Sequence, residues 1–383
     1  MNTNIEEQYS ILPFFKKFEE VLKRKVGAKK EPVILLQGGF GKHNTGDDTL
    51  MLVAREEILK VYPNAKIYAL CHNPEFLKRD YGIEGIKFKS LATIKALFKS
   101  DALVVPAGGL VNNIDYNSYI KSLFNPRGKF VFLSMLIMIL RHKCTVVFGV
   151  GIHDMPDFIV KILAKIVLPR VDLLAVRDKH TVKVVEKLGC TDFYFSHDPV
   201  IAYKKKVTYN WESYKQNKNI PFDDFIVLNY RMTKNSEETQ RALETLSEYM
   251  QYISENYPSM GIILMPFSIH PTFKLENDVI AMRKLIKKAR EKYNVKNYIL
   301  LKEYLTADDV KTIAEHAKLL ILTRHHAPVI TYSCHIPTIV ISYNFKCREF
   351  AELGEYKYII DYDKLTVEEL KEITDNECSE YKR

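Results

Sequence analysis

The sequence predicts an α/β fold with two Rossmann-like domains and a central cleft. Short apolar or β-branched runs alternate with amphipathic stretches of helical length, which is typical of parallel sheets covered by helices on both faces. This alternation occurs in two series, separated by the polar stretch Tyr203–Asp224. We therefore expect an N-terminal domain at 1–205, a linker at 206–224 and a C-terminal domain at 225–383.

In each series the predicted strands are short and the predicted helices are longer. The first series has a helix at Asp47–Val61 and strands at Pro32–Gln37, Lys66–Leu70, Ile86–Phe88, Ala102–Pro106, Thr145–Val150, Leu173–Val176 and Asp192–Phe195. The second has helices at Glu237–Asn256, Leu275–Lys292 and Asp308–His316, and strands at Phe225–Asn229, Gly261–Pro266, Tyr298–Leu301, Leu319–Leu322 and Thr338–Ser342. The tail Leu365–Ile373 has helical spacing and could pack back across the hinge. Ligand sites of such sheets lie at the carboxyl ends of the strands, which we expect to face the cleft.

The composition is that of a globular protein with anionic partners. Of the 383 residues, 47% are hydrophobic and 27% charged, and the formal net charge is +9. The basic residues are spread along the chain and are not interleaved with aromatic residues in a compact motif, which argues against nucleic acid. The six cysteines form no C-x-x-C pair and lie at no zinc-ligand spacing, so we expect reduced thiols, no metal and a cytoplasmic location.

Two segments bear on membrane contact. The longest apolar run, Phe130–Leu140, is shorter than the roughly 20 residues that cross a bilayer, and we interpret it as a buried helix. The segment Phe14–Lys30 mixes Phe and Leu with basic residues. It predicts a solvated amphipathic helix, with peripheral association at the inner face of the membrane as the alternative. The first ten residues are polar and acidic and do not resemble a signal peptide.

The first candidate motif follows the first predicted strand and spans Gln37–Asp48 (QGGFGKHNTGDD). Glycines let backbone N–H groups approach a ligand, and the N-terminus of the next helix favours an anion. The third glycine of a dinucleotide fingerprint is missing, and no acidic residue ends the second strand, which disfavours NAD. The alternative is a tight strand–helix turn capped by Asp47. The candidate ligand-binding residues are Gly41, Asn44, Thr45, Asp47 and Asp48.

Two further motifs follow strands of the first series. Pro106–Asn113 (PAGGLVNN) contains Gly108 and Gly109, which would line a cleft without side chains and suit a sugar; a loop that needs positive φ is the alternative. Arg177–Thr181 (RDKHT) places Arg177 at a strand end. Arg177 could face the cleft, and Asp178 could simply cap the following helix.

The most informative motif is Thr323–Pro328 (TRHHAP), directly after the predicted strand Leu319–Leu322. An arginine beside two histidines at the end of a buried strand is difficult to explain by packing, although an exposed polar loop remains an alternative. Arg binds carboxylate or phosphate through a planar fork, and His can transfer a proton near neutral pH. Arg231, just past the strand Phe225–Asn229, would supply a second fork. These residues predict a site for a small polyanion with a proton-transfer group.

With these motifs in order, the chain resembles the polysaccharide pyruvyl transferase family, whose members resemble two-domain transferases of the GT-B type. The resemblance covers about Val33 to Gly354 and rests on an ordered set of five elements. These are Gly41–Asp48, Gly108-Gly109, Arg177–Thr181, Arg324-His325-His326 with its continuation to Pro337, and Tyr343-Asn344-Phe345-Lys346. The chain differs from the family pattern at His325, where Leu or Phe is usual, at Asp48, where Glu is common, and at Thr181, where Ser is usual.

The resemblance implies a reaction and assigns roles to these residues. It implies phosphoenolpyruvate as the co-substrate, with no other cofactor, bound in the C-terminal domain by Arg231, Arg324, His325, His326 and Lys346. A glycan or lipid-linked saccharide would be the acceptor, on the side of Gly41, Asn44, Thr45, Asp47, Gly108, Gly109 and Arg177. His326 is the expected acid/base, with Asp47 or Asp48 orienting or deprotonating the acceptor hydroxyl. The alternatives are a GT-B glycosyltransferase using a nucleotide-sugar and a non-catalytic relative that binds sugar or phosphate.

Overall fold

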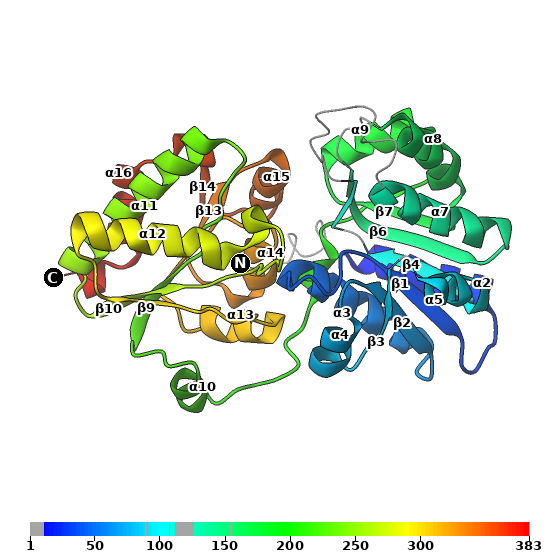
Figure 1. The fold of residues 1–383 in the computed structure, drawn as a ribbon, viewed down its shortest axis with the longest axis horizontal. Helices are drawn as coiled ribbons and strands as arrows, with labels where there is room; N and C mark the ends of the chain where they lie inside the picture. Colours follow the sequence, from blue (N-terminus) through cyan, green and yellow to red (C-terminus); the bar gives the residue numbers. More distant parts are fainter. Residues whose placement is uncertain are drawn as a thin grey trace. The chain divides into compact units, whose positions relative to one another are not determined.

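The fold consists of two compact α/β units (Figure 1). The computed structural model describes residues 11–88, 90–106, 108–111, 126–152, 155 and 157–382. The first unit contains the described residues up to Lys42 and those from Asp47 to Tyr203. The second contains His43–Gly46 and the chain from Lys204 onward. The second unit thus includes four residues that lie within the sequence of the first.

The first unit is built on a parallel sheet in the order β3-β2-β1-β4-β6-β7-β8, with β5 paired to β6. Its central strands are buried along most of their length, which explains their continuous apolar sequences. The strands are β1 (Val33–Gln37), β2 (Lys66–Cys71), β3 (Glu84–Lys87), β4 (Ala102–Pro106), β5 (Gly109–Val111), β6 (Cys144–Ile152), β7 (Leu173–Val176) and β8 (Tyr194–Phe195).

Helices cover both faces of this sheet. On one face, four helices share a core cluster with the strands: α5 (Leu91–Lys99), α7 (Pro126–Leu140), α8 (Phe158–Val167) and α9 (Lys179–Lys187). On the other face, Phe14 and Phe18 of α2 pack on Phe148 of β6, with ring centroids 5.3 and 5.9 Å apart. The remaining helical segments are α3 (Thr45–Val61), α4 (Pro74–Tyr81) and the short 3₁₀ turns η1 (Leu168–Arg170) and η2 (Pro199–Ala202).

The second unit has its own parallel sheet, in the order β11-β10-β9-β12-β13-β14. The strands are β9 (Asp224–Leu228), β10 (Met260–Leu264), β11 (Tyr298–Leu300), β12 (Leu319–Leu322), β13 (Thr338–Ser342) and β14 (Tyr358–Asp361). The helices are α10 (Trp211–Asn217), α11 (Ser236–Asn256), α12 (Asp278–Tyr293), α13 (Ala307–Ala314), α14 (His326–Thr331), α15 (Phe345–Leu353) and α16 (Val367–Glu377). Four 3₁₀ turns complete it: η3 (Lys274–Glu276), η4 (Tyr332–Cys334), η5 (Tyr362–Lys364) and η6 (Ser379–Tyr381).

Two segments differ from their expected places. The stretch 206–224, expected to be a linker, carries helix α10 and belongs to the second unit. Its Trp211 ring stacks 4.0 Å from the His316 ring, and the Tyr214 hydroxyl donates to Asp309 at 2.9 Å. The aromatic side chains in this polar segment therefore anchor it to the unit that follows.

The C-terminal helix, for which packing back across the hinge was considered, packs on the core of the second unit. Leu370 and Ile373 of α16 are part of that unit's core cluster, and the Thr374 hydroxyl lies 2.7 Å from the Tyr249 hydroxyl of α11. In Figure 1, α16 accordingly lies beside α11.

The segment considered for peripheral membrane contact forms α2 (Leu12–Val26), whose apolar side faces the protein. Phe14, Phe15 and Phe18 are all buried, so this is an ordinary amphipathic helix of the first unit. Among the described residues, none of the helices combines the length and the apolar character that a bilayer-crossing segment requires.

Candidate functional site

In the second unit, polar side chains gather at the carboxyl ends of three neighbouring strands. Asn229 and Arg231 follow β9, and Arg324 follows β12, which pairs with β9. Glu276 and Asp278 come from the connection between β10 and α12, and β10 pairs with the other edge of β9. The strand order therefore explains why residues far apart in the sequence meet here.

Asn229 and Asp278 form the buried base of this cluster. Asn229 is fully buried. Its side-chain Nδ2 donates to Met265 O at 3.0 Å, and its side-chain Oδ1 accepts from the Arg324 backbone N–H at 3.1 Å. The Asp278 carboxylate, also fully buried, accepts from Phe267 N–H at 2.9 Å and Ser268 N–H at 3.1 Å. Because these partners are mainly backbone groups, the position of this carboxylate is fixed.

Arg324 is held by two carboxylates. Its Nε donates to Asp278 Oδ1 at 2.8 Å, its Nη2 lies 2.7 Å from the same oxygen, and its Nη1 donates to Glu276 Oε2. Its side chain is 8% exposed. Burial alone would lower the pKa of Arg324, but Asp278 and Glu276 outweigh burial and raise it, so the guanidinium remains charged.

Glu276 bridges the two arginines. Its Oε1 accepts from Arg231 Nη2 at 3.3 Å, while Oε2 accepts from Arg324. Burial disfavours the charged form of Glu276, but the positive charges of Arg324 and Arg231 outweigh burial and lower its pKa below the ordinary value. A single carboxylate thus spans two guanidinium forks. The cluster of Arg231, Arg324, Glu276 and Asp278 is called the arginine–carboxylate cluster below.

Arg231 is positioned by aromatic residues. Its guanidinium carbon lies 4.0 Å from the centre of the Tyr343 ring, a cation–π arrangement. Its carbonyl accepts from the Tyr362 hydroxyl at 3.1 Å. Tyr343 is the tyrosine of the Y-x-x-K element, so that element supports Arg231.

The two histidines of the Arg324–His326 motif lie at the start of α14 and are both half-buried. Their ring centroids are 5.1 Å apart, and the His325 ring meets Phe350 edge-on at 6.1 Å. His325, at the usual Leu or Phe position, therefore packs against an aromatic ring as an apolar residue would. The His326 ring lies so close to Gly46 that a Cβ there would be 2.1 Å from Nδ1.

The first motif is divided between the two units. His43–Gly46 belongs to the second, where Thr45 N–H donates to Phe267 O at 2.9 Å and the Thr45 hydroxyl to Leu305 O at 2.7 Å. Asn44 forms an antiparallel bridge with Ser268, and its side-chain oxygen accepts from Gly46 N–H at 3.1 Å. Asn44 and Thr45, expected on the acceptor side in the N-terminal domain, are therefore part of the second unit.

The rest of that motif belongs to the first unit. Gly41 has φ +73°, and its N–H donates to Asp48 Oδ1 at 2.9 Å. Asp48 is fully buried, so it fixes the turn before α3. Asp47 is half-buried, and its carboxylate lies over Gly39, where a Cβ would be 2.8 Å from Oδ2.

The two other predicted motifs of the first unit make contacts within that unit. Arg177 is buried and forms an ion pair with Asp198 of the same unit. Asp178 caps α9 by accepting from Thr181 N–H at 2.7 Å, as the capping interpretation predicted. The Gly108 carbonyl accepts from Gly151 N–H at 3.2 Å, and Gly109 begins β5. Ala107, Asn112 and Asn113 of that motif lie outside the described residues.

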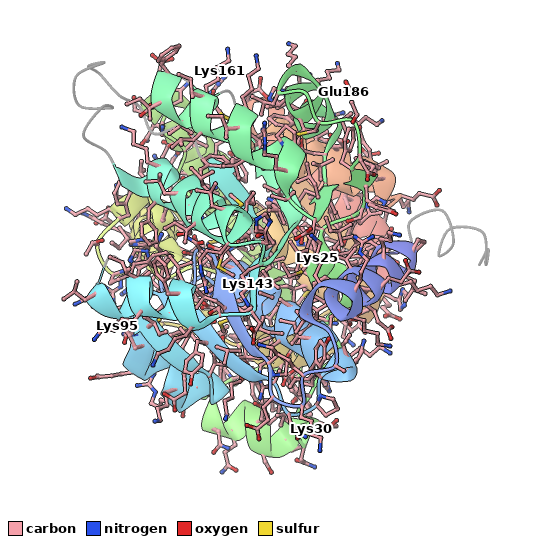
Figure 2. The ribbon with its side chains drawn as sticks, turned by 90° about the vertical axis from the view of Figure 1, so that its right-hand side faces the viewer. Lys25, Lys30, Lys95, Lys143, Lys161 and Glu186 are labelled. Carbon is pink, nitrogen blue, oxygen red and sulfur yellow. The ribbon has the colours of Figure 1, made fainter. Side chains whose placement is uncertain are left out.

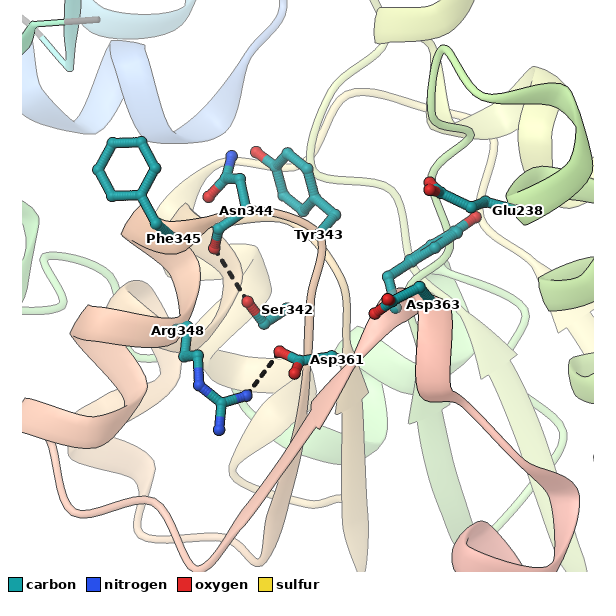
Figure 3. A pocket seen from close by; sticks show the side chains of 9 residues that line it. Glu238, Ser342, Tyr343, Asn344, Phe345, Arg348, Asp361 and Asp363 are labelled. Carbon is teal, nitrogen blue, oxygen red and sulfur yellow. Dashed lines mark hydrogen bonds and ion pairs between the residues drawn. The ribbon is translucent and has the colours of Figure 1, made fainter.

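Lys346 and a nearby pocket complete the site residues of the second unit. Lys346 is buried in the first turn of α15. Beside it, a pocket of about 240 Å³ lies at the ends of β13 and β14 (Figure 3). Arg348 pairs with Asp361 at 2.5 Å across this pocket, and Tyr343 forms part of its lining. Tyr343 is therefore shared between the pocket and the arginine–carboxylate cluster.

The sequence analysis found both arginines but missed Glu276, Asp278 and Asn229. These three residues were inside or next to segments assigned only to secondary structure. The available signal was Asn277-Asp278 before the apolar period of α12, a helix start with an acidic first turn. That signal marks where a helix begins and gives no indication that Asp278 pairs with an arginine.

The fold places this chain in the class of two-unit α/β proteins of the GT-B type. Similar solved structures include a UDP-GlcNAc 2-epimerase of Methanocaldococcus jannaschii (14% identity, 90% of this chain and 91% of that chain, TM-score 0.56). The UDP-GlcNAc 2-epimerase of Neisseria meningitidis is also similar (12%, 91% and 92%, 0.55), as is S. aureus MnaA in a structure with UDP (13%, 90% and 88%, 0.57). At these identities the likeness concerns the fold alone.

The family model named polysaccharide pyruvyl transferase matches residues 44–344. The chain therefore belongs to the polysaccharide pyruvyl transferase family. A search of curated proteins gave no match.

Proposed function

We propose that this protein transfers the pyruvyl group of phosphoenolpyruvate to sugar hydroxyls of a cell-surface polysaccharide or its lipid-linked precursor, forming a pyruvate ketal. Membership of the family supports a transferase. The observation that carries the donor assignment is the Glu276 carboxylate bridging Arg231 and Arg324. Phosphoenolpyruvate presents a carboxylate and a phosphate, the groups that such paired forks bind.

Donor binding requires a change in the charge of the arginine–carboxylate cluster. The two arginines and two carboxylates are balanced, so an added polyanion would meet no net positive charge. Asp278 is fully buried and fixed by backbone N–H groups, whereas the Glu276 side chain is 39% exposed and sits on the short turn η3. The donor would take the place of Glu276 at the two forks, while Asp278 would keep Arg324 oriented.

His326 is the proposed acid. It would protonate C3 of the enol, which gives a cation at C2 beside the carboxylate. One sugar hydroxyl adds to C2 and loses its proton, and the C2–O bond to phosphate breaks with its electron pair going to the phosphate. A second hydroxyl then adds to C2 and loses its proton, which closes the ketal; of the two hydroxyl protons, one restores His326 and the other leaves with the phosphate. Arg231 and Arg324 would stabilise the charge that develops on the departing phosphate.

Of the two carboxylates in the first motif, Asp47 is the one that would orient or deprotonate the acceptor hydroxyl. Asp48 is buried and held by Gly41, which makes it a positioning residue. Asp47 is half-buried in the first turn of α3, where a carboxylate can still meet a hydroxyl.

The proposal is tested by calorimetry with phosphoenolpyruvate on the wild type and on Arg231→Gln. Removing one fork should weaken binding at least about thirtyfold, on the order of 2 kcal/mol. Arg283→Gln, on the exposed side of α12, is the matched control and should bind as the wild type does.

A thermal-shift comparison separates this function from the nucleotide-sugar alternative. Phosphoenolpyruvate should raise the unfolding temperature, and uridine and guanosine diphosphates should not. Protection by a nucleoside diphosphate together with none by phosphoenolpyruvate would refute the proposal.

A further inference from the structure

One face of the first unit exposes an unusual amount of apolar surface. Among the described residues, nine of the fourteen exposed large apolar side chains lie on three helices: three on α5, two on α7 and four on α8. They are Leu91, Ile94, Phe98, Leu133, Leu140, Phe158, Ile159, Ile162 and Ile166. The three helices are neighbours on the same face of the sheet, as Figure 2 shows, so these side chains belong to one surface. We call it the α5–α7–α8 face.

The helical spacing shows that this exposure is systematic. On α8, Val160, Ala164 and Val167 face the core, while Phe158, Ile162 and Ile166 form a second apolar stripe facing outward. The remaining outward positions of α8 carry Lys161 and Lys165, so the outward side of this helix mixes large apolar and basic side chains. Contiguous exposed apolar surface of this kind marks an interaction site.

The same face is positively charged. The sequences of α5, α7 and α8 contain no Asp or Glu. Lys95, Lys99, Lys161 and Lys165 are exposed and form no ion pair within the described part of the chain (Lys95 and Lys161 are labelled in Figure 2). Asp101 and Asp157, at the ends of these helices, are buried. The adjacent α9 exposes Glu186 between lysines and does not continue the pattern.

The surface is also rigidly built. The Arg141 guanidinium, after α7, donates to the carbonyls of Leu97 and Phe98 at 2.6 Å and lies 5.1 Å from the centre of the Phe98 ring. This contact ties the end of α5 to α7. The apolar side chains are thus presented by a fixed platform.

We propose that the α5–α7–α8 face docks on the surface of an anionic lipid bilayer. Apolar side chains between unpaired lysines match the boundary between acyl chains and negative headgroups. Association of two copies through this face is disfavoured, because an isologous dimer would oppose each lysine to like charges. The inference is independent of the pyruvyl-transfer reaction.

The test is sedimentation of the full chain with vesicles of phosphatidylcholine alone or mixed with phosphatidylglycerol. The wild type should bind the anionic vesicles preferentially, and added salt should weaken binding. Each lysine near an anionic surface contributes about fivefold to partitioning. The charge variant, Lys→Glu at positions 95, 99, 161 and 165, should therefore reduce binding more than tenfold. The apolar variant Phe158→Ser/Ile162→Ser should also reduce it more than tenfold.

The matched control carries the same charge change elsewhere: Lys284→Glu, Arg290→Glu, Lys296→Glu and Lys302→Glu, all exposed in the second unit. This control should bind the anionic vesicles nearly as well as the wild type does. All replaced side chains are exposed, so circular dichroism should show folded proteins. Three results would overturn the proposal: no binding of the wild type, equal loss in the control, or dimerisation through this face that Phe158→Ser/Ile162→Ser abolishes.

Discussion

The two arginines of the second unit illustrate what a sequence can reveal at the level of single residues. Arg231 and Arg324 each follow a buried strand, where a charged side chain is difficult to explain by apolar packing. Their identification needed only strand periodicity and the chemistry of guanidinium. Glu276 lay inside a predicted helix, Leu275–Lys292, and only the sheet order places it beside the two arginines. The sequence therefore did not reveal that two carboxylates balance the charge of the two arginines.

Replacing Glu276 tests whether it competes with the donor. Glu276→Gln removes the charge from a carboxylate that bridges both forks, so the arginines should become available to an incoming anion. We expect the affinity for phosphoenolpyruvate to rise about tenfold, on the order of 1.4 kcal/mol, by calorimetry. Glu291→Gln, exposed on α12, is the control. Unchanged or weaker binding by Glu276→Gln would show that the carboxylate does not occupy the donor position.

Replacing Arg324 should affect stability as well as binding. Arg324→Ala leaves the fully buried Asp278 without its cation, which should cost about 3–5 kcal/mol in the free energy of unfolding. The single tryptophan, Trp211, stacks in the second unit, so its fluorescence during urea unfolding reports on that unit. Lys357→Ala, which removes an exposed lysine paired with Glu377, is the control and should leave the free energy of unfolding nearly unchanged.

A double-mutant cycle separates the buried pair from other effects. Asp278→Asn retains an acceptor for the backbone N–H groups but removes the charge. Arg324→Ala/Asp278→Asn should be more stable than the sum of the two single changes predicts, by about 1–3 kcal/mol. Strict additivity would mean that Asp278 and Arg324 do not stabilise one another.

At the scale of elements, the sequence predicted fully buried strands better than partly buried or very short ones. The strands Leu173–Val176 and Leu319–Leu322 are buried along their whole length and agree with the structure at both ends. Strands β5 and β14 were missed, because β5 has three residues and β14 is only partly buried. A continuous apolar run is the signal of a buried strand, and neither of these two segments has a long one.

The α3 segment gives a prediction at this scale. Gly46 lies in the first turn of α3, where alanine is intrinsically better by up to about 1 kcal/mol, so Gly46→Ala should not harm the helix. The new Cβ would overlap the His326 ring and would lie 2.5 Å from the His326 Cβ, so the ring and the start of α14 must both shift. We expect kcat for pyruvyl transfer to fall by about 10²–10⁴, the usual contribution of a positioned acid.

The readouts for this variant distinguish displacement of His326 from general damage. The unfolding temperature should fall, because the buried Cβ crowds His326, but circular dichroism should show a folded protein and phosphoenolpyruvate should still bind through the arginines. Gly354→Ala, where a Cβ would be no closer than 3.2 Å to other atoms, is the control. Wild-type activity in Gly46→Ala would exclude a role for the His326 position.

For the whole molecule, two tandem α/β units were predictable because the alternation of strands and helices occurs twice. The outward apolar stripe of α8 was not recognised, because a sequence pattern does not show which apolar positions of a helix other elements cover. The assignment of 206–224 was incorrect since polar composition concealed the anchoring of Trp211 and Tyr214. In both segments the difference arises from tertiary packing, which a sequence pattern does not show.

The inclusion of His43–Gly46 in the second unit has a consequence for synthesis on the ribosome. The Thr45 hydroxyl bonds to a carbonyl 260 residues further along the chain. At roughly 5–20 residues per second, that carbonyl is made about 13–50 s after Thr45. The first unit can fold during this interval, but the loop before α3 must wait for its partners. The second unit is completed only when this early segment docks, so the surroundings of His326 form late in synthesis.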